Sequence, residues 1–182
     1  TIPKNNFYTN PFLSENNGVG LNQKLYISGN DLFLSYNNSK LNPLTNINHD
    51  IILPLETFAV SLNLNNIIFE KFSLTAGILK EKESFLLSKS SGAFGFENDN
   101  VTNFYGINLT KNFNKNRNFS FSNTIGFSNF KNNNNNFILG STDVMSTSFE
   151  IDYEINNFFG NDKFNITLSQ PNRVEKGEMN FR

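Results

Sequence analysis

The chain has 182 residues, 15 basic and 16 acidic side chains, a formal net charge of -1 and no cysteine. The balanced charge carries no basic stripe, which excludes nucleic acid as an expected partner, and the lack of cysteine excludes a disulfide framework and a thiolate metal site. The mean hydropathy of -0.40, with no run of about 18 apolar residues, excludes a helical membrane protein.

Residues 1–54 are expected to form an irregular lead-in with short strands, because prolines interrupt the apolar runs. Only residues 23–28 and 31–36 have the composition of strands in this part, and residues 56–64 continue the series. The one histidine of the chain, His49, has no second nitrogen or sulfur ligand for a metal and no partners for a nucleophilic triad. We therefore expect His49 to be an exposed loop residue.

A period of two dominates the chain from residue 71 onward. Residues 71–78, 101–111, 118–130 and 145–155 alternate large apolar with small polar side chains, which is typical of a strand with two different faces. The longer runs, of about eleven residues, are roughly twice an ordinary soluble strand and match a tilted bilayer crossing. The pattern predicts an all-β, antiparallel up-and-down outer-membrane β-barrel over residues 55–182, incomplete at the C-terminus.

The two faces of these strands have different expected roles. The expected lumen-facing residues are Thr102, Asn108, Ser120, Ser122, Thr124, Glu150, Asp152 and Glu154. The expected lipid-facing residues are Tyr105, Ile107, Leu109, Phe119, Phe121, Ile125, Phe127, Phe149, Ile151 and Tyr153. Two residues, Asn123 and Phe104, lie on the face of opposite character. The three carboxylates are expected either to shape an acidic lumen or to form a hydrated polar face.

Connections between the strands alternate in length. Residues 81–100 and 131–144 are long connections, whereas residues 111–117 and 156–162 are short ones. Because bacterial barrels have short periplasmic turns and longer outer loops, the two long segments are expected to face outward. Residues 90–95 (SSGAFG) are expected to form a flexible loop, or to fold into the barrel mouth, since small residues allow close backbone approach.

Two segments contain sequence motifs in addition to the alternating pattern. Residues 74–96 read LTAGILKEKESFLLSKSSGAFGF, and residues 164–181 read FNITLSQPNRVEKGEMNF. Together they resemble the C-terminal region of bacterial subtilisin-like serine peptidases that carry an autotransporter-type barrel. The matching positions are Gly92, Ala93, Phe94, Gly95, Ser169, Gln170, Pro171, Arg173, Val174, Glu175 and Gly177. Within the second segment, residues 169–178 are expected to form a loop held by an ion pair or a solvated turn.

The resemblance covers about residues 55–182 and implies a translocator or anchor in the bacterial outer membrane. Its partners would be outer-membrane lipid, the barrel assembly machinery and a protease passenger upstream of Thr1. The chain departs from a complete family member, because it has no triad segments and stops at Arg182 without closing strands. We therefore expect part of a longer protein, with no catalytic, cofactor or metal site in this segment.

Two other interpretations remain open from the sequence. A soluble β-sandwich, secreted or on the cell surface, would also alternate apolar and polar residues and would serve as an interaction or stalk module. A small porin-like channel would use the same strands. Strand length and the unequal connections favour the barrel wall over the sandwich.

Overall fold

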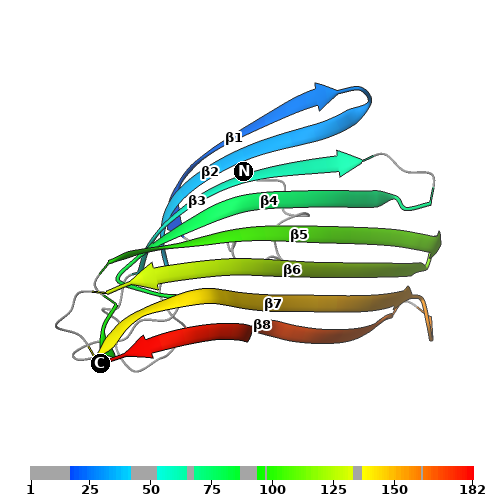
Figure 1. Ribbon diagram of the computed structural model, residues 1–182. Coiled ribbons are helices and arrows are strands. Elements are labelled where there is room, and N and C mark those ends of the chain that lie inside the picture. Colours follow the sequence, from blue (N-terminus) through cyan, green and yellow to red (C-terminus); the bar gives the residue numbers. More distant parts are fainter. Residues whose placement is uncertain are drawn as a thin grey trace.

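The computed structural model describes residues 17–41, 53–64, 68–86, 94–96, 98–132, 137–160 and 162–182. These residues form one antiparallel sheet of eight strands, in which every strand pairs with the next one along the chain (Figure 1). The strands are β1 (Asn17–Ile27), β2 (Asn30–Leu41), β3 (Leu53–Leu64), β4 (Lys71–Lys82), β5 (Asp99–Asn114), β6 (Arg117–Lys131), β7 (Ile138–Asn156) and β8 (Lys163–Phe181). The expectation of an all-β, antiparallel up-and-down sheet is confirmed.

The first two strands are longer and more regular than the sequence pattern indicates. β1 and β2 pair without interruption from Ile27 opposite Asn30 to Asn17 opposite Lys40, and β2 continues the sheet to β3. Their connection is the two-residue turn of Ser28 and Gly29, with φ values of 49° and 82°. Positive φ at both central residues is what a tight hairpin with the normal strand twist requires. Residues 17–41 therefore belong to the same sheet as the rest.

The connections lie at two ends of the sheet. At one end of the sheet β1 is followed by β2, β3 by β4, β5 by β6 and β7 by β8, and at the other end β2 is followed by β3, β4 by β5 and β6 by β7 (Figure 1). The expected long connection over residues 131–144 is wrong, because β6 continues to Lys131 and β7 already begins at Ile138. Register shifts between Ser128 and Phe130 and between Thr142 and Met145 change the phase of the alternation.

Residues 169–178 are also different from the expectation of a loop or turn, since all of them lie within β8. Gln170 pairs with Phe149 and Arg173 pairs with Thr147, so Pro171 and Asn172 together stand opposite Ser148. Proline is tolerated there because β8 bulges at this point, and a residue in a bulge is not needed as a donor in the ladder. The expected ion pair is present, as Arg173 binds Glu175 two residues further along the strand.

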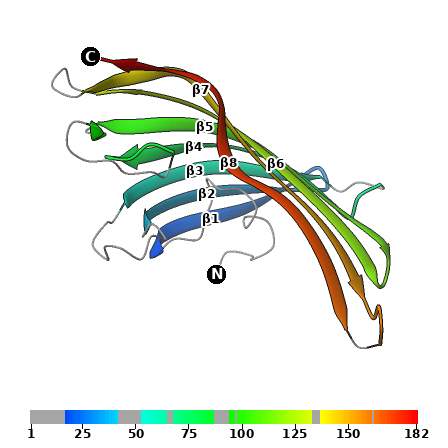
Figure 2. The same cartoon turned by 90° about the horizontal axis from the view of Figure 1, so that it is seen from below.

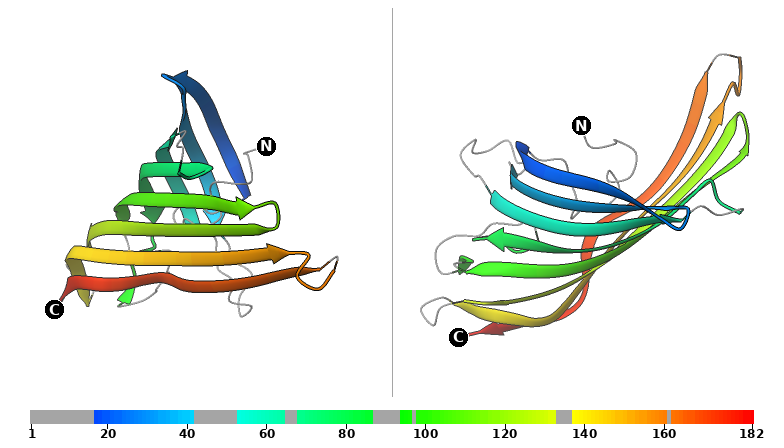
Figure 3. Two further views of the ribbon diagram at one scale, coloured as in Figure 1. Left: turned by 90° about the vertical axis from the view of Figure 1, so that its right-hand side faces the viewer. Right: turned by 90° about the horizontal axis from the view of Figure 1, so that it is seen from above.

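The sheet separates small polar side chains from large apolar ones across its whole width. We call polar face the side that carries Ser61, Ser73, Thr75, Thr102, Ser122, Thr124, Ser128, Ser146 and Ser148, all buried. We call apolar face the side that carries Phe58, Leu74, Ile78, Val101, Tyr105, Phe127, Ile166 and Leu168, all exposed. The sheet is strongly twisted and curled (Figures 2 and 3). The usual arrangement of a water-soluble sheet, with apolar residues covered, is reversed.

Phe104 is the largest fully buried apolar residue on the polar face, which also carries Leu55 and Leu79, and its neighbours explain why it fits. Gly77 pairs with Phe104 on β4, and Gly126 pairs with it on β6. The ring lies over Gly77, where a Cβ atom would collide with it, and Phe104 is fully buried. Glycines on both sides thus provide the space for one aromatic ring among small residues.

Replacing Gly77 by alanine is expected to destabilise the sheet by about 1–3 kcal/mol. The added Cβ would meet the Phe104 ring and would lie 2.6 Å from the Phe58 carbonyl oxygen, which is backbone and cannot turn away. Denaturant unfolding of the refolded chain measures the loss. Ala76→Val, at the adjacent position on the exposed apolar face, is the control and should change stability by less than about 0.5 kcal/mol. Equal stability of Gly77→Ala and the control would contradict the packing of Phe104.

Candidate functional site

The structure brings all eight residues that were expected to face a lumen onto the polar face. Cross-strand pairing connects Asn108 to Ser122 and Ser122 to Glu150. Thr102 pairs with Ser128, and the hydroxyl groups of these two fully buried side chains form a hydrogen bond of 2.6 Å. The others follow the same alternation on β6 and β7: Ser120, Thr124, Asp152 and Glu154.

The ten residues that were expected to face lipid all lie on the apolar face. Register places them opposite one another from β5 to β7, in the pairs Tyr105–Ile125, Leu109–Phe121, Phe121–Ile151 and Phe119–Tyr153, with Ile107, Phe127 and Phe149 on the same side. The rings of Tyr105 and Phe127 meet edge to face at 6.3 Å. Asn123 is the polar exception on this face, and its amide donates a hydrogen bond to the Ser148 carbonyl at 3.1 Å.

Two of the three carboxylates on β7 have polar partners on the neighbouring strands. Asp152 accepts hydrogen bonds from the hydroxyls of Ser120 on β6 and Thr167 on β8. Glu154 forms an ion pair with Lys163 at 2.6 Å. Glu150 stands between Ser122 and Ser169 in the register. The row therefore joins three strands through polar contacts on the polar face.

The apolar face is bounded by charged or polar side chains at both ends. At the end of the longer connections, the apolar residues of β3, β4 and β5 are bounded by Glu56, Lys80 and Asp99, respectively. At the opposite end, Lys111 and Arg117 occupy the same side of β5 and β6. The apolar residues thus form a band of limited height.

Two hydrogen bonds join the β3–β4 connection to the C-terminal part of β5, beyond the apolar band. The Asn112 backbone N–H donates to the Glu70 carboxylate at 2.7 Å, and the Lys111 amine donates to the Ile68 carbonyl. The hydrogen bond from Asn112, with a weaker attraction from Lys111, holds the pKa of Glu70 below its ordinary value.

The positions of the family resemblance do not gather into one site. Gly92 and Ala93 lie outside the described residues, as does His49. Gly95 is buried, while the ring of Phe94 is exposed beside Phe137 at 5.2 Å. The remaining positions belong to β8: Ser169, Gln170, Pro171, Arg173, Val174, Glu175 and Gly177. There the Glu175 carboxylate receives both the Arg173 guanidinium and the Thr147 hydroxyl, which donates at 2.8 Å.

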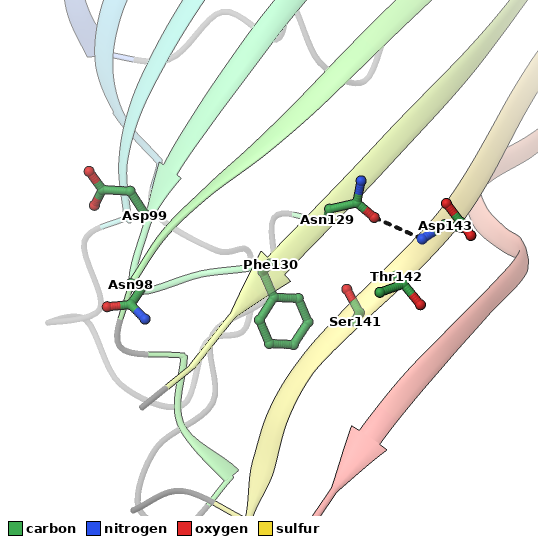
Figure 4. A pocket seen from close by; sticks show the side chains of 7 residues that line it. All are labelled: Asn98, Asp99, Asn129, Phe130, Ser141, Thr142 and Asp143. Atoms are coloured by element: carbon green, nitrogen blue, oxygen red, sulfur yellow. Dashed lines mark hydrogen bonds between the residues drawn. The ribbon is translucent and has the colours of Figure 1, made fainter. Parts of the chain in front are cut away.

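An open hollow of about 600 Å³ lies where β5, β6 and β7 approach the longer connections (Figure 4). Its lining residues are Asn98, Asp99, Asn129, Phe130, Ser141, Thr142 and Asp143. The Asp143 backbone N–H donates to the Asn129 side-chain oxygen at 2.7 Å, which stabilises the positive φ of 52° at Asp143. Sequence reasoning missed this hollow because it depends on the bulges of β6 and β7. Across the residues that the structure describes, no group of three or more His, Cys, Asp or Glu is arranged to hold a metal ion.

No helix in the described ranges is long and apolar enough to cross a membrane. No protein-family model matches the chain, and comparison with curated proteins and with solved structures finds no significant match.

The Thr102–Ser128 pair offers a direct test of the polar face. Thr102→Val leaves the buried Ser128 hydroxyl without this partner and is expected to destabilise the protein by about 1–3 kcal/mol. The double variant Thr102→Val with Ser128→Ala removes both hydroxyls. Its loss of stability should be smaller than the sum of the losses in the two single variants. Denaturant unfolding of the four proteins of this cycle measures the coupling. Strict additivity would show that the two hydroxyls do not interact.

Proposed function

We propose that this sheet is part of the wall of an outer-membrane β-barrel, with the apolar face toward lipid and the polar face toward the interior. The observation that carries the proposal is the reversed distribution of side chains. Small hydroxyl residues are buried on one face, while large apolar residues are exposed on the other; for example, Tyr105 is 54% exposed and Phe127 is 47% exposed. A continuous apolar surface of this kind is rare on a soluble monomer and calls for an apolar neighbour.

The height of the apolar band fits a bilayer. On β5 the band runs from Val101 to Leu109, and on β6 it runs from Phe119 to Phe127. At about 3.3 Å per residue, each of these segments is about 26 Å long, and a strand tilt of about 40° brings this to about 20 Å along the membrane normal. Outer-membrane barrels have an apolar band of about 25 Å between polar ends, so the band of this sheet is slightly shorter but of the same order.

The polar face has the small hydroxyl residues that suit a barrel interior better than a sandwich core. Among the described residues, the buried hydroxyl oxygens of Ser122, Ser146 and Ser148 have no hydrogen-bond partner on the protein. A buried hydroxyl without any partner costs about 1–3 kcal/mol in an apolar core, so a face with three of them does not fit the core of a β-sandwich. The carboxylate of Glu150 on the same face is consistent with a wet interior.

A membrane position requires that the edges of the sheet be paired. β1 and β8 are the two edge strands of the described sheet and pair only with β2 and β7, respectively. Lipid offers no hydrogen bonds to the backbone, so every strand edge in the hydrocarbon region must pair with another strand. The proposal therefore includes further strands that complete the ring beside β1 and β8.

The translocator or anchor role is a further part of the proposal, and it is supported by the resemblance of residues 55–182 to the barrel region of subtilisin-like autotransporters. In this role the segment is not catalytic. It holds or exports a protease passenger encoded upstream, and the barrel assembly machinery inserts it into the outer membrane. Expression of the whole parent protein, outer-membrane fractionation and a heat-modifiability gel test the proposal. Recovery as a water-soluble folded protein without a heat shift would overturn it in favour of the β-sandwich.

A charged substitution in the middle of the apolar face distinguishes lipid from water. Leu74 is 43% exposed on β4, so Leu74→Arg should lower the free energy of unfolding by less than about 0.5 kcal/mol if water covers this face. If lipid covers the face, the same substitution is expected to cost about 2–4 kcal/mol and to reduce the heat-modifiable fraction in lipid vesicles.

Glu56→Arg is the matched control for this substitution, because Glu56 is exposed at the charged end of the same face. It is expected to cost less than about 1 kcal/mol, as charged residues do near the membrane surface. Equal folding of Leu74→Arg and Glu56→Arg in vesicles would argue against a lipid-covered face.

A further inference from the structure

An aromatic cluster interrupts the polar face near the longer connections. Phe130 on β6 follows the buried serines of that face, and its ring contacts Phe85 at 4.6 Å and Phe96 at 5.2 Å between centroids. Phe85 and Phe96 come from the connection between β4 and β5, and Ile138 and Val144 on β7 complete the cluster. The two ends of this connection therefore fold over the polar face instead of extending away from the sheet.

A buried polar group holds the first part of the connection in place. The carboxylate of Glu81, which is fully buried at the end of β4, accepts hydrogen bonds from the Ser84 hydroxyl at 3.4 Å and from the Leu86 backbone N–H at 3.0 Å. The Asn100 amide at the start of β5 donates to the Ser84 carbonyl. Ser84 is thus bonded to both strands that the connection joins, and its backbone position is defined by two separate contacts.

The second part of the connection is held by the next hairpin. The Asn132 side-chain amide donates to the Gly95 carbonyl at 2.7 Å and to the Ile138 carbonyl at 3.0 Å. One side chain therefore joins this part of the connection to the β6–β7 hairpin. Gly95 is buried next to Phe96, whose ring packs on Phe130.

From these contacts we propose that residues 84–86, together with Gly95 and Phe96, form a fixed apolar constriction inside the barrel, at the end of the longer connections. This inference rests on the proposed function, because the polar face is an interior only if the sheet closes. Hydroxyls and carboxylates predominate on the rest of this face, where Phe104, Leu55 and Leu79 are the larger buried apolar exceptions, so the aromatic cluster is the largest apolar group on a mainly polar path. An apolar constriction resists wetting and restricts the passage of ions.

Planar-bilayer recordings of the purified parent protein test the constriction. Phe85→Ala combined with Phe96→Ala is expected to raise the single-channel conductance by roughly twofold or more, because two rings leave the path. Phe94→Ala is the matched control and should leave the conductance unchanged, since Phe94 is 52% exposed and its ring contacts Phe137 outside the cluster. Inserted, heat-modifiable protein with the same conductance in all variants would overturn the inference.

A labelling experiment keeps the inference testable if the double variant does not fold, and it uses the absence of native cysteine. Ser84→Cys is a small change at a fully buried site, whereas Lys82→Cys replaces an exposed residue two positions earlier, at the end of β4. A membrane-impermeant maleimide should react with Cys at position 84 about tenfold more slowly than at position 82. Equal rates would contradict the constriction. A protein that shows no heat shift would instead contradict the barrel itself, so the two failures are distinguishable.

Discussion

The antiparallel register of eight consecutive strands is the constraint on which the other features of this protein depend. Because side chains alternate along each strand and the pairs stand directly opposite one another, a register error of one residue would move hydroxyls onto the apolar face. The register from Thr75 through Gly106 and Thr124 to Ser148 keeps small residues together across four strands. The separation of the two faces follows from this pairing.

Close lateral packing on the polar face has its own requirement, since bulky residues need compensating small neighbours. Phe104 is accommodated between Gly77 and Gly126, and the Thr102–Ser128 hydrogen bond satisfies two buried hydroxyls beside it. The larger rings of this face are gathered near one end, where the β4–β5 connection covers them. Aromatic residues therefore enter the polar face at two places, between glycines and beneath a connection.

The elements predicted with most success were those with uninterrupted alternation. The segments over residues 101–111, 118–130 and 145–155 lie within β5, β6 and β7, and their two faces agree with the register. The alternation failed where bulges change its phase, near Phe130 and Asp143 and opposite Pro171. It also underestimated β1 and β2, because several of their residues are polar on both sides and the turn at Ser28 has no asparagine–glycine signal.

The sequence by itself determined the all-β class, the strand direction and the assignment of residues to two faces, because these follow from a period of two that is local in the chain. Only the tertiary structure decided which residues of different strands meet. The ring of Phe85 contacts the ring of Phe130, and the Asn100 amide donates a hydrogen bond to the Ser84 carbonyl, so both contacts join segments that are distant along the chain. Such contacts depend on how the curled sheet and its connections come together, and no local pattern encodes them.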